Sequence, residues 1–302
     1  MRVLVLMSTY NGAKYVEQQI DSILNQKNVD VFLLIRDDGS MDETISIINR
    51  YKDSGRVFLY SGKNKGPAFS FMDLMVKAKN EYNMFDYYAF ADQDDFWERN
   101  KLIEAIKILE NMSLKYRLYA SALKIVDEHL NLLSIPVIEE YSFPEYMFRN
   151  QCAGCTMVFN YDIVELMSRY LPTYLEMHDI WLLRVVHCVS DSEVYVDKKS
   201  YICYRQHDNN VVGANHGIMH VINLKARQLL CKNEVGYKTS VEIINGYKEI
   251  IKDREFEFLN MVIESKKSLR KRYELICYVC KFRFSNFMRK VFFIWNAICN
   301  NV

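Results

Sequence analysis

The first hundred residues alternate between two hydrophobic periodicities, and this alternation constrains the fold more than any other feature of the chain. Four short apolar runs have the length of buried strands: Val3–Met7, Val31–Ile35, Val57–Tyr60 and Tyr87–Ala91. Between them, three segments carry helical spacing: Tyr15–Asn25, Glu43–Tyr51 and Phe69–Lys79. Strands and helices in this order form right-handed crossovers, so we expect an α/β fold with a mainly parallel sheet and helices on both faces.

A polar loop follows each of these four strands. In such sheets ligands bind beyond the carboxyl ends of the strands, so the loops should form one continuous rim. Its hydroxyls, acids, glycines and lysine suit a nucleotide that carries a diphosphate and a sugar. The residues that we expect to bind it are Ser8, Thr9, Tyr10, Asp38, Lys65, Gly66, Asp92, Gln93 and Asp95. Each loop alone could be an ordinary turn, and neither the dinucleotide fingerprint nor a P-loop is present.

The fourth loop, Asp92-Gln93-Asp94-Asp95, places three carboxylates within four residues directly after a buried strand. Carboxylates this close repel one another, and a shared cation relieves the repulsion. Oxygen ligands favour a hard ion, Mg²⁺ or Mn²⁺, whose remaining positions can take substrate phosphates. The alternative is a solvated acidic turn that leads into the next helix.

The next segment, from about residue 118 to 207, contains strand-like runs at Tyr119–Val126 and Val194–Tyr204. Between these runs, His178-Asp179 opens an apolar helix. An acid in the first turn of a helix is often only stabilised by the helix dipole. His207, in the sequence Tyr-Arg-Gln-His, could likewise be an ordinary surface histidine.

Composition excludes several classes of protein. The net charge of +1 gives no reason to expect nucleic acid as a partner. No secretory signal and no apolar stretch of membrane-spanning length is found, so we expect a cytoplasmic protein or one attached to the inner face of a membrane. The eight cysteines fit free thiols, because Cys152/Cys155 and Cys277/Cys280 each lack the second pair of a zinc site.

The chain changes character after about residue 215, where the pattern becomes helical. Between Lys266 and Lys290 stand nine basic residues and one acid, Glu274, interleaved with aromatic side chains. A basic, aromatic, amphipathic segment predicts an interfacial anchor to an anionic membrane. The alternative is a helix pair that packs on the core and exposes a solvated basic face.

These motifs together resemble the inverting family-2 glycosyltransferases of the GT-A fold, over about residues 2–212. The resemblance is carried by Val-Leu-Met-Ser-Thr-Tyr-Asn-Gly, Arg-Asp-Asp-Gly-Ser and Asp92-Gln93-Asp94, which is similar to the family's DxD metal motif. It implies a GT-A domain over residues 1–214, with a nucleotide-sugar half (1–117) and an acceptor half (118–214). Residues 215–302 would then be a helical extension.

The resemblance also implies roles for single residues. Ser8, Thr9 and Tyr10 would line the base and ribose pocket, and Asp38 would bond the base or ribose. Asp92 and Asp94 would be the DxD pair, with Asp94 binding the metal directly and His207 joining the metal or diphosphate. Asp95 would support the site or bond the donor sugar. Asp179 matches the catalytic base, which would take the proton of the acceptor hydroxyl.

The extended signatures Asp-Gln-Asp-Asp-Phe-Trp, Gly-Cys-Thr-Met, His-Asp-x-Trp and Tyr-Arg-Gln-His-x-Asn-Asn-Val-Val-Gly resemble bacterial polysaccharide rhamnosyltransferases. This implies dTDP-L-rhamnose as donor and a glycan or polyprenol-linked glycan as acceptor, in the synthesis of O-antigens or capsules. Phe96, Trp97, Met157 and Trp181 are candidates for an apolar wall against a 6-deoxy sugar, or for core positions.

Three alternatives remain open at this level. A UDP-hexose could be the donor in place of dTDP-rhamnose. A nucleotidyltransferase would also use acids and a metal, although it should show a basic Gly-rich loop near the N-terminus. A protein that only binds sugar nucleotides would not need both the DxD pair and Asp179. The sequence does not indicate the oligomeric state.

Overall fold

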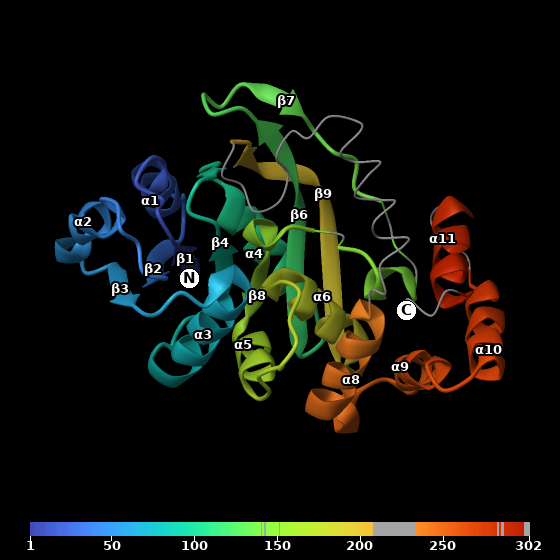
Figure 1. Ribbon diagram of the computed structural model, residues 1–302. Helices are drawn as coiled ribbons and strands as arrows, with labels where there is room; N and C mark the ends of the chain where they lie inside the picture. Colours follow the sequence, from blue (N-terminus) through green and yellow to red (C-terminus); the bar gives the residue numbers. More distant parts are fainter. Residues whose placement is uncertain are drawn as a thin grey trace.

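The computed structural model describes residues 1–139, 141, 143–150, 152–207, 234–282, 284 and 287–298 (Figure 1). The N-terminal half has the predicted alternation of strands and helices. Its strands are β1 (Arg2–Thr9), β2 (Asp30–Asp37), β3 (Val57–Ser61) and β4 (Tyr87–Ala91), which are parallel in the order β3-β2-β1-β4. Its helices are α1 (Val16–Leu24), α2 (Thr44–Asn49), the 3₁₀ turn η1 (Lys52–Ser54) and α3 (Gly66–Glu81).

Helix α3 begins at Gly66, three residues before the helical spacing predicted, and has proline in its first turn. The fixed φ of Pro67 suits this position, and its missing N–H has no helical partner to lose. The loop Lys63–Lys65, just before the first turn of α3, packs against the end of β2, where Arg36 donates to the Lys63 carbonyl at 3.0 Å. The polar loop and the start of the helix therefore form one structural unit.

The second part of the sheet is mixed. Strand β8 (Val158–Asn160) pairs antiparallel with β4 and with β6 (Tyr116–Val126), and β9 (Ser192–Arg205) runs parallel to β6. Two short strands complete the nine, β5 (Phe96–Trp97) against β9 and β7 (Leu132–Ser134) against β6. The remaining elements of this part are α4 (Lys101–Glu110), η2 (Glu145–Met147), η3 (Gly154–Thr156), α5 (Tyr161–Ser168) and α6 (His178–Cys188). The predicted mixed α/β sheet is therefore confirmed.

The position of β5 shows that the sheet is curled. It follows β4 after only Asp92–Asp95, yet β8, β6 and β9 lie between the two strands in the sheet order. On a flat sheet four strand spacings would be roughly 19 Å, and five residue steps of fully extended chain reach at most roughly 18 Å. The sheet therefore curls until its last strand returns toward β4. The acidic loop spans the gap.

Both faces of the sheet are covered, and alternate residues of β1 belong to different cores. Val3, Val5 and Met7 pack with residues of α1 and α4, whereas Leu4 and Leu6 pack with residues of α3, α5 and α6. This alternation follows from the period of two along a strand. Burial on both faces explains why the strands read as continuous apolar runs.

The C-terminal part is helical, as predicted. It contains α8 (Val235–Tyr247), η4 (Lys248–Ile250), α9 (Asp253–Ser265), α10 (Leu269–Cys280) and α11 (Phe287–Ile298). Ile243, Phe258, Leu275 and Phe293, one from each α-helix, belong to the same buried core as Leu4. The helices thus share a core with the sheet. The predicted boundary at residues 214–215 lies outside the described residues, so the domain division stays a prediction.

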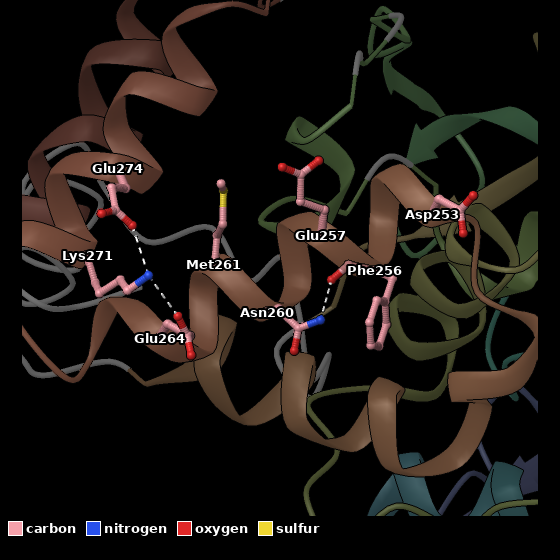
Figure 2. A pocket seen from close by; sticks show the side chains of 8 residues that line it. All are labelled: Asp253, Phe256, Glu257, Asn260, Met261, Glu264, Lys271 and Glu274. Atoms are coloured by element: carbon pink, nitrogen blue, oxygen red, sulfur yellow. Dashed lines mark hydrogen bonds and ion pairs between the residues drawn. The ribbon is translucent and has the colours of Figure 1, made fainter.

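A groove of about 490 Å³ lies between α9 and α10 (Figure 2). Its lining is mainly acidic, with Lys271 held between Glu264 and Glu274. None of its residues belongs to the polar rim of the sheet, and Figure 1 shows α9 and α10 apart from the ends of β1, β2 and β4. This groove is therefore separate from the site that the sequence predicts. Within the described residues, every helix is too short or too polar to cross a bilayer.

Candidate active site

The carboxyl ends of β1, β2 and β4 meet the end of β9 at one edge of the sheet, and the predicted rim is assembled there. The loop after β4 is tied to the loop after β1 by the side-chain amide of Gln93. Its Oε1 accepts from the Tyr10 N–H at 2.9 Å, and its Nε2 donates to the Tyr10 carbonyl at 3.2 Å. A Cβ at Gly12 would lie 2.2 Å from Gln93 Oε1, so Gly12 makes room for this link. Gln93, expected to contact the donor, thus also joins two loops.

The acids of the second loop are engaged inside the protein. Asp37 Oδ2 accepts from the N–H groups of Gly39 and Ser40 at 3.0 and 2.8 Å. Asp38 is only 2% exposed, and its Oδ1 accepts from Arg36. Its other oxygen accepts from the backbone N–H groups of Lys65 and Gly66, both at 2.9 Å. These bonds join the second loop to the start of α3.

Three of the predicted donor contacts therefore have structural partners. Both oxygens of Asp38 and the N–H groups of Lys65 and Gly66 are used between the loops, and Lys65 Nζ lies 3.2 Å from Asp73 Oδ1. Thr9 is buried and donates to Asp37 at 3.1 Å, whereas Ser8 is half-buried and Tyr10 is exposed. The predicted contacts of these residues with a donor stay predictions.

Asp92 and Asp95 lie together with Cys155 in the interior of the rim. One ligand atom of each residue lies within 4.8 Å of the others. Burial, and next the charge of Asp94, raises the pKa of Asp92 to about 7; Asp179 adds to the shift. The same two causes raise the pKa of Asp95 well above its usual range. These carboxyls therefore resist ionisation together, and a bound cation would lower the cost of their charged forms.

Asp94 and His207 meet, although 112 residues separate them in the chain. His207 Nε2 lies 2.9 Å from Asp94 Oδ2, and the imidazole stacks on Tyr15 with ring centroids 4.9 Å apart. Arg205 fixes this arrangement, because its Nε donates to the Asp94 carbonyl at 2.8 Å and its N–H donates to Asp95 Oδ1 at 3.2 Å. The end of β9 is thereby held on the acidic loop.

Asp179 stands in the first turn of α6 and is largely buried. Its Oδ2 accepts from the Gly154 N–H at 2.9 Å and from Asn150 Nδ2 at 3.3 Å, and its Oδ1 accepts from the Ile180 N–H at 2.7 Å. Two of these donors come from outside the helix, so Asp179 does more than neutralise the helix dipole. The charge of Asp179 also contributes to the raised pKa of Asp92, after burial and Asp94.

Lys101 is a residue of this site that the sequence did not reveal. Its side chain is 1% exposed, and its Nζ lies 3.6 Å from the centroid of the Trp97 ring. Burial lowers the pKa of Lys101 to about 7, and the charges of Cys155 and Asp95 oppose this shift. Neither Lys101 Nζ nor Asp95 Oδ2 has a hydrogen-bond partner among the described residues. A lysine at the start of a helix normally reads as a surface residue, so no sequence signal marked it.

Cys155 and His178 also shape the site, although the sequence predicted no role for either. Burial raises the pKa of the Cys155 thiol well above its usual range, so the thiol stays protonated. His178 is buried between Phe71 and Phe90, at centroid distances of 3.7 and 4.8 Å, and burial lowers its pKa to about 4. Cys155 stands in Gly-Cys-Thr-Met, which we gave as a signature of the resemblance without assigning a role to the thiol.

The proposed apolar wall is largely core. Trp97, Met157 and Trp181 are buried in the two hydrophobic cores, and only Phe96 is half-buried. Trp97, Met157 and Trp181 are therefore core residues, which was the alternative given for them in the sequence. Of these four residues, Phe96 alone keeps an exposed surface, and its contact with the sugar stays a prediction.

Comparison with known proteins gives one family and several relatives. The sequence model of "Glycosyl transferase family 2" matches residues 4–169. The chain is similar to the dTDP-rhamnosyl transferase RfbG of Shigella flexneri, with 29% identity over 218 residues, 69% of this chain and 74% of RfbG.

Two solved structures share the fold. The first is Staphylococcus aureus TarS 1-349 in complex with UDP-GlcNAc, with a TM-score of 0.61, 15% identity, and 100% of this chain and 88% of that chain covered. The second is the mannosyltransferase PcManGT of Pyrobaculum calidifontis in complex with GDP-Man and Mn²⁺, with a TM-score of 0.55, 12% identity, and 99% and 85% of the two chains covered.

Proposed function

The chain belongs to glycosyl transferase family 2, and on that premise we propose that it transfers L-rhamnose from dTDP-L-rhamnose to a glycan or lipid-linked glycan acceptor, with inversion at the anomeric carbon. The expected GT-A fold and the glycosyltransferase class are confirmed by the family match and the structural likenesses. The donor assignment rests on one observation, the match to a dTDP-rhamnosyl transferase over 69% of the chain. The acceptor would belong to the synthesis of a cell-surface polysaccharide.

We propose that Asp94, Asp92 and His207 hold a divalent cation, Mg²⁺ or Mn²⁺. Two carboxylates and an imidazole are a suitable donor set, and the 2.9 Å between Asp94 and His207 brings two of them together. Asp92 instead groups with Asp95 and Cys155. A thiol held protonated is a poor ligand for a hard ion, which favours the Asp94 side of the loop. When bound, such an ion neutralises the charge that develops on the leaving diphosphate.

Asp179 is the proposed base. It would accept the proton of the acceptor hydroxyl while that oxygen attacks the anomeric carbon, and the nucleoside diphosphate would leave from the opposite face. A single displacement of this kind needs no covalent nucleophile. The backbone N–H of Gly154 and the amide of Asn150 keep the carboxylate in one orientation.

The donor is tested by competition. Purified protein is incubated with Mn²⁺, a rhamnose-ended lipid acceptor and equal concentrations of dTDP-rhamnose and UDP-glucose. The ratio of the kcat/KM values of the two donors is measured. We expect the ratio to favour dTDP-rhamnose, because the chain is similar to a dTDP-rhamnosyl transferase. A preference for a UDP-hexose would replace the donor assignment and leave the roles of Asp94 and Asp179 standing. In a separate assay with a nucleoside triphosphate and a sugar 1-phosphate, release of diphosphate would indicate a nucleotidyltransferase instead.

The metal site is tested with Asp94→Ala. Calorimetric titration of dTDP is done with and without Mn²⁺. Removing one ligand should abolish the Mn²⁺-dependent part of the affinity and leave the metal-independent part, because the ion already keeps several waters. Asp53→Ala, in the η1 turn away from the rim, is the matched control. Equal Mn²⁺ dependence in both variants would contradict the assignment.

We further propose that the C-terminal helices touch an anionic membrane on its cytoplasmic side. Tyr273, Phe287, Trp295 and Ile298 are exposed, as an interfacial segment requires. Part of the basic charge is compensated, since Lys267 and Lys271 pair with Glu264, and Arg289 pairs with Glu139. The attraction to lipid should therefore be weaker than the sequence count suggests.

A further inference from the structure

A cavity of about 230 Å³ lies beside the loop that anchors Asp179. Its wall is built from distant parts of the chain: β6 contributes Ser121, the segment after β7 contributes Val137, Glu139 and Tyr141, the loop before η3 contributes Ala153, and α11 contributes Arg289. Figure 1 shows the segment after β7 descending on the side of the molecule where α11 lies. None of these residues belongs to the polar rim.

The cavity and the proposed base share one short segment of backbone. Cys152 and Ala153 line the cavity, and the next residue, Gly154, donates its N–H to Asp179 Oδ2 at 2.9 Å. Asn150, which donates to the same oxygen, also accepts from the Cys152 N–H at 3.2 Å. The cavity and the carboxylate of Asp179 are therefore joined through the backbone of residues 152–154.

Helix α11 closes this cavity through Arg289. The guanidinium forms an ion pair with Glu139 and lies 3.9 Å from a carboxylate oxygen of the buried Glu145. Its Cζ lies 5.1 Å from the centroid of the Tyr141 ring, and the side chain is only 17% exposed. The C-terminal extension thus contributes a largely buried, paired charged group to a cavity whose wall adjoins the backbone that holds Asp179.

We propose that this cavity binds the terminal sugar unit of a neutral acceptor, and that Arg289 and Glu139 position it for attack. The inference rests on the proposed glycosyltransfer with Asp179 as base. It gives the C-terminal extension a role in acceptor binding besides any contact with a membrane. Arg289 and Glu139 are positioning residues here, since neither meets the reacting atoms.

The composition of the wall selects this class of ligand. Arg289 supplies donors and Glu139 acceptors, which together match hydroxyl groups that both donate and accept. The charged lining residues, Glu139 and Arg289, pair with each other, and the buried Glu145 lies 3.9 Å from the same guanidinium, so the wall offers no uncompensated positive charge to an anionic group. Tyr141 and Val137 offer apolar surface to the C–H face of a ring. A volume of about 230 Å³ is below the range of drug-sized sites and suits a single ring.

Arg289→Ala and Arg289→Lys are compared with Lys290→Ala, the next residue on the same helix, whose Nζ bonds the carbonyls of Cys280 and Phe282 away from the cavity. Each variant is assayed with the donor that the wild type uses, against octyl glycosides of rhamnose, glucose, galactose and N-acetylglucosamine. We expect Arg289→Ala to raise the acceptor KM by about 10- to 100-fold, the effect of losing a hydrogen bond to a charged group. Arg289→Lys should recover part of it, and Lys290→Ala should match the wild type.

Hydrolysis of the donor without acceptor separates positioning from folding. It should stay within about twofold of wild type in Arg289→Ala. A second variant leaves the Arg289–Glu139 ion pair intact. Because Val137 is 87% exposed, Val137→Trp can block the mouth of the cavity without disturbing the core. It should also raise the acceptor KM, whereas Leu133→Trp on the exposed strand β7 should not.

The results distinguish a failure of the proposed function from a failure of the cavity assignment. If the wild type neither hydrolyses nor transfers any sugar nucleotide, the proposed function is wrong. If it does, the cavity assignment is overturned when Arg289→Ala and Val137→Trp keep the wild-type acceptor KM, when donor hydrolysis falls as much as transfer, or when none of the neutral glycosides is an acceptor.

Discussion

The charged form of Asp92 is unfavourable in the folded protein, and the pH dependence of stability should show this. Burial and Asp94 raise the folded-state pKa of Asp92 from 3.8 to about 7. A raised folded-state pKa gives a stability contribution that is fully present below pH 3.8 and is lost as pH rises to about 7. The loss is at most about 1.4 kcal/mol per pH unit.

Asp92→Asn removes this titration. Without added metal, the variant should gain stability relative to wild type as pH rises from 4 to 7, and the difference should level off above pH 7. Chemical denaturation at half-unit steps of pH measures it. Asp53→Asn is the control, because Asp53 is exposed in the η1 turn. A constant difference between Asp92→Asn and wild type across this range would show that Asp92 is not strained.

Asp179→Asn tests the proposed base. Asparagine keeps the shape and can still accept from Gly154, so the fold and dTDP binding should be retained. The proton acceptor is lost, and kcat should fall by about 10²–10⁴. Asp162, also in the first turn of a helix, is the matched control, and Asp162→Asn should keep its kcat. If Asp179→Asn instead lowers the melting temperature and leaves kcat unchanged, Asp179 only stabilises α6.

At the scale of elements, the η3 turn and α6 are packed so closely that one methyl group should disturb catalysis. A Cβ at Gly154 would lie 2.7 Å from His178 Nε2 and 3.1 Å from Asp179 Cβ. His178 cannot retreat, because it stacks on Phe71 at 3.7 Å. Gly154→Ala should therefore shift Asp179 and lower kcat by about 10²-fold, with little change in the donor KM.

Gly55→Ala provides the comparison for this steady-state assay. Gly55 has a φ of +65° and open space around its Cβ position, so alanine there costs stability and should leave kcat unchanged. A kcat within twofold of wild type in Gly154→Ala would show that the turn can adjust without moving the carboxylate.

The strands, the helices and the loops of the rim could be predicted because their signals are local. Val3–Met7 and the other apolar runs announce strands by composition, and their parallel order follows from the helices between them. The pairing of β5 with β9 could not be predicted, since two residues carry no periodicity. The burial of Lys101 depends on that pairing. We expected Asp38 to contact a ligand. In the folded chain its carboxylate is bonded to Arg36 and to the start of α3. These contacts depend on the tertiary fold and could not be predicted from the sequence.

At the scale of the whole molecule, the C-terminal helices have a buried face and an exposed face. Leu275, Val279, Phe293 and Ala297 are buried in the core beneath the sheet, while Phe287 and Trp295 are 76% and 52% exposed. The sequence could count the basic residues of this part. It could not show that Glu264 and Glu139 pair with them, because those acids lie outside the basic segment.

The double variant Phe287→Ser/Trp295→Ser tests the membrane face without touching the core. The full chain should sediment with phosphatidylserine vesicles at low salt, and each basic residue near the surface contributes about 1 kcal/mol. The variant should sediment less, with an unchanged melting temperature. Leu171→Ser removes an exposed apolar residue elsewhere and should behave as wild type. Absence of sedimentation of the wild type, or sedimentation that ignores salt, would contradict the membrane contact.

The closure of the curled sheet also sets when the enzyme can become active during its synthesis. Asp94 leaves the ribosome 113 positions ahead of His207, and Arg205 emerges just before that histidine. At roughly 5–20 residues per second, the acidic loop waits on the order of 6–20 s for the strand that holds it. A nascent chain that ends before β9 would expose repelling carboxylates and an incomplete sheet. Sugar nucleotides in the cell would therefore meet a working site only after both halves of the fold have been made.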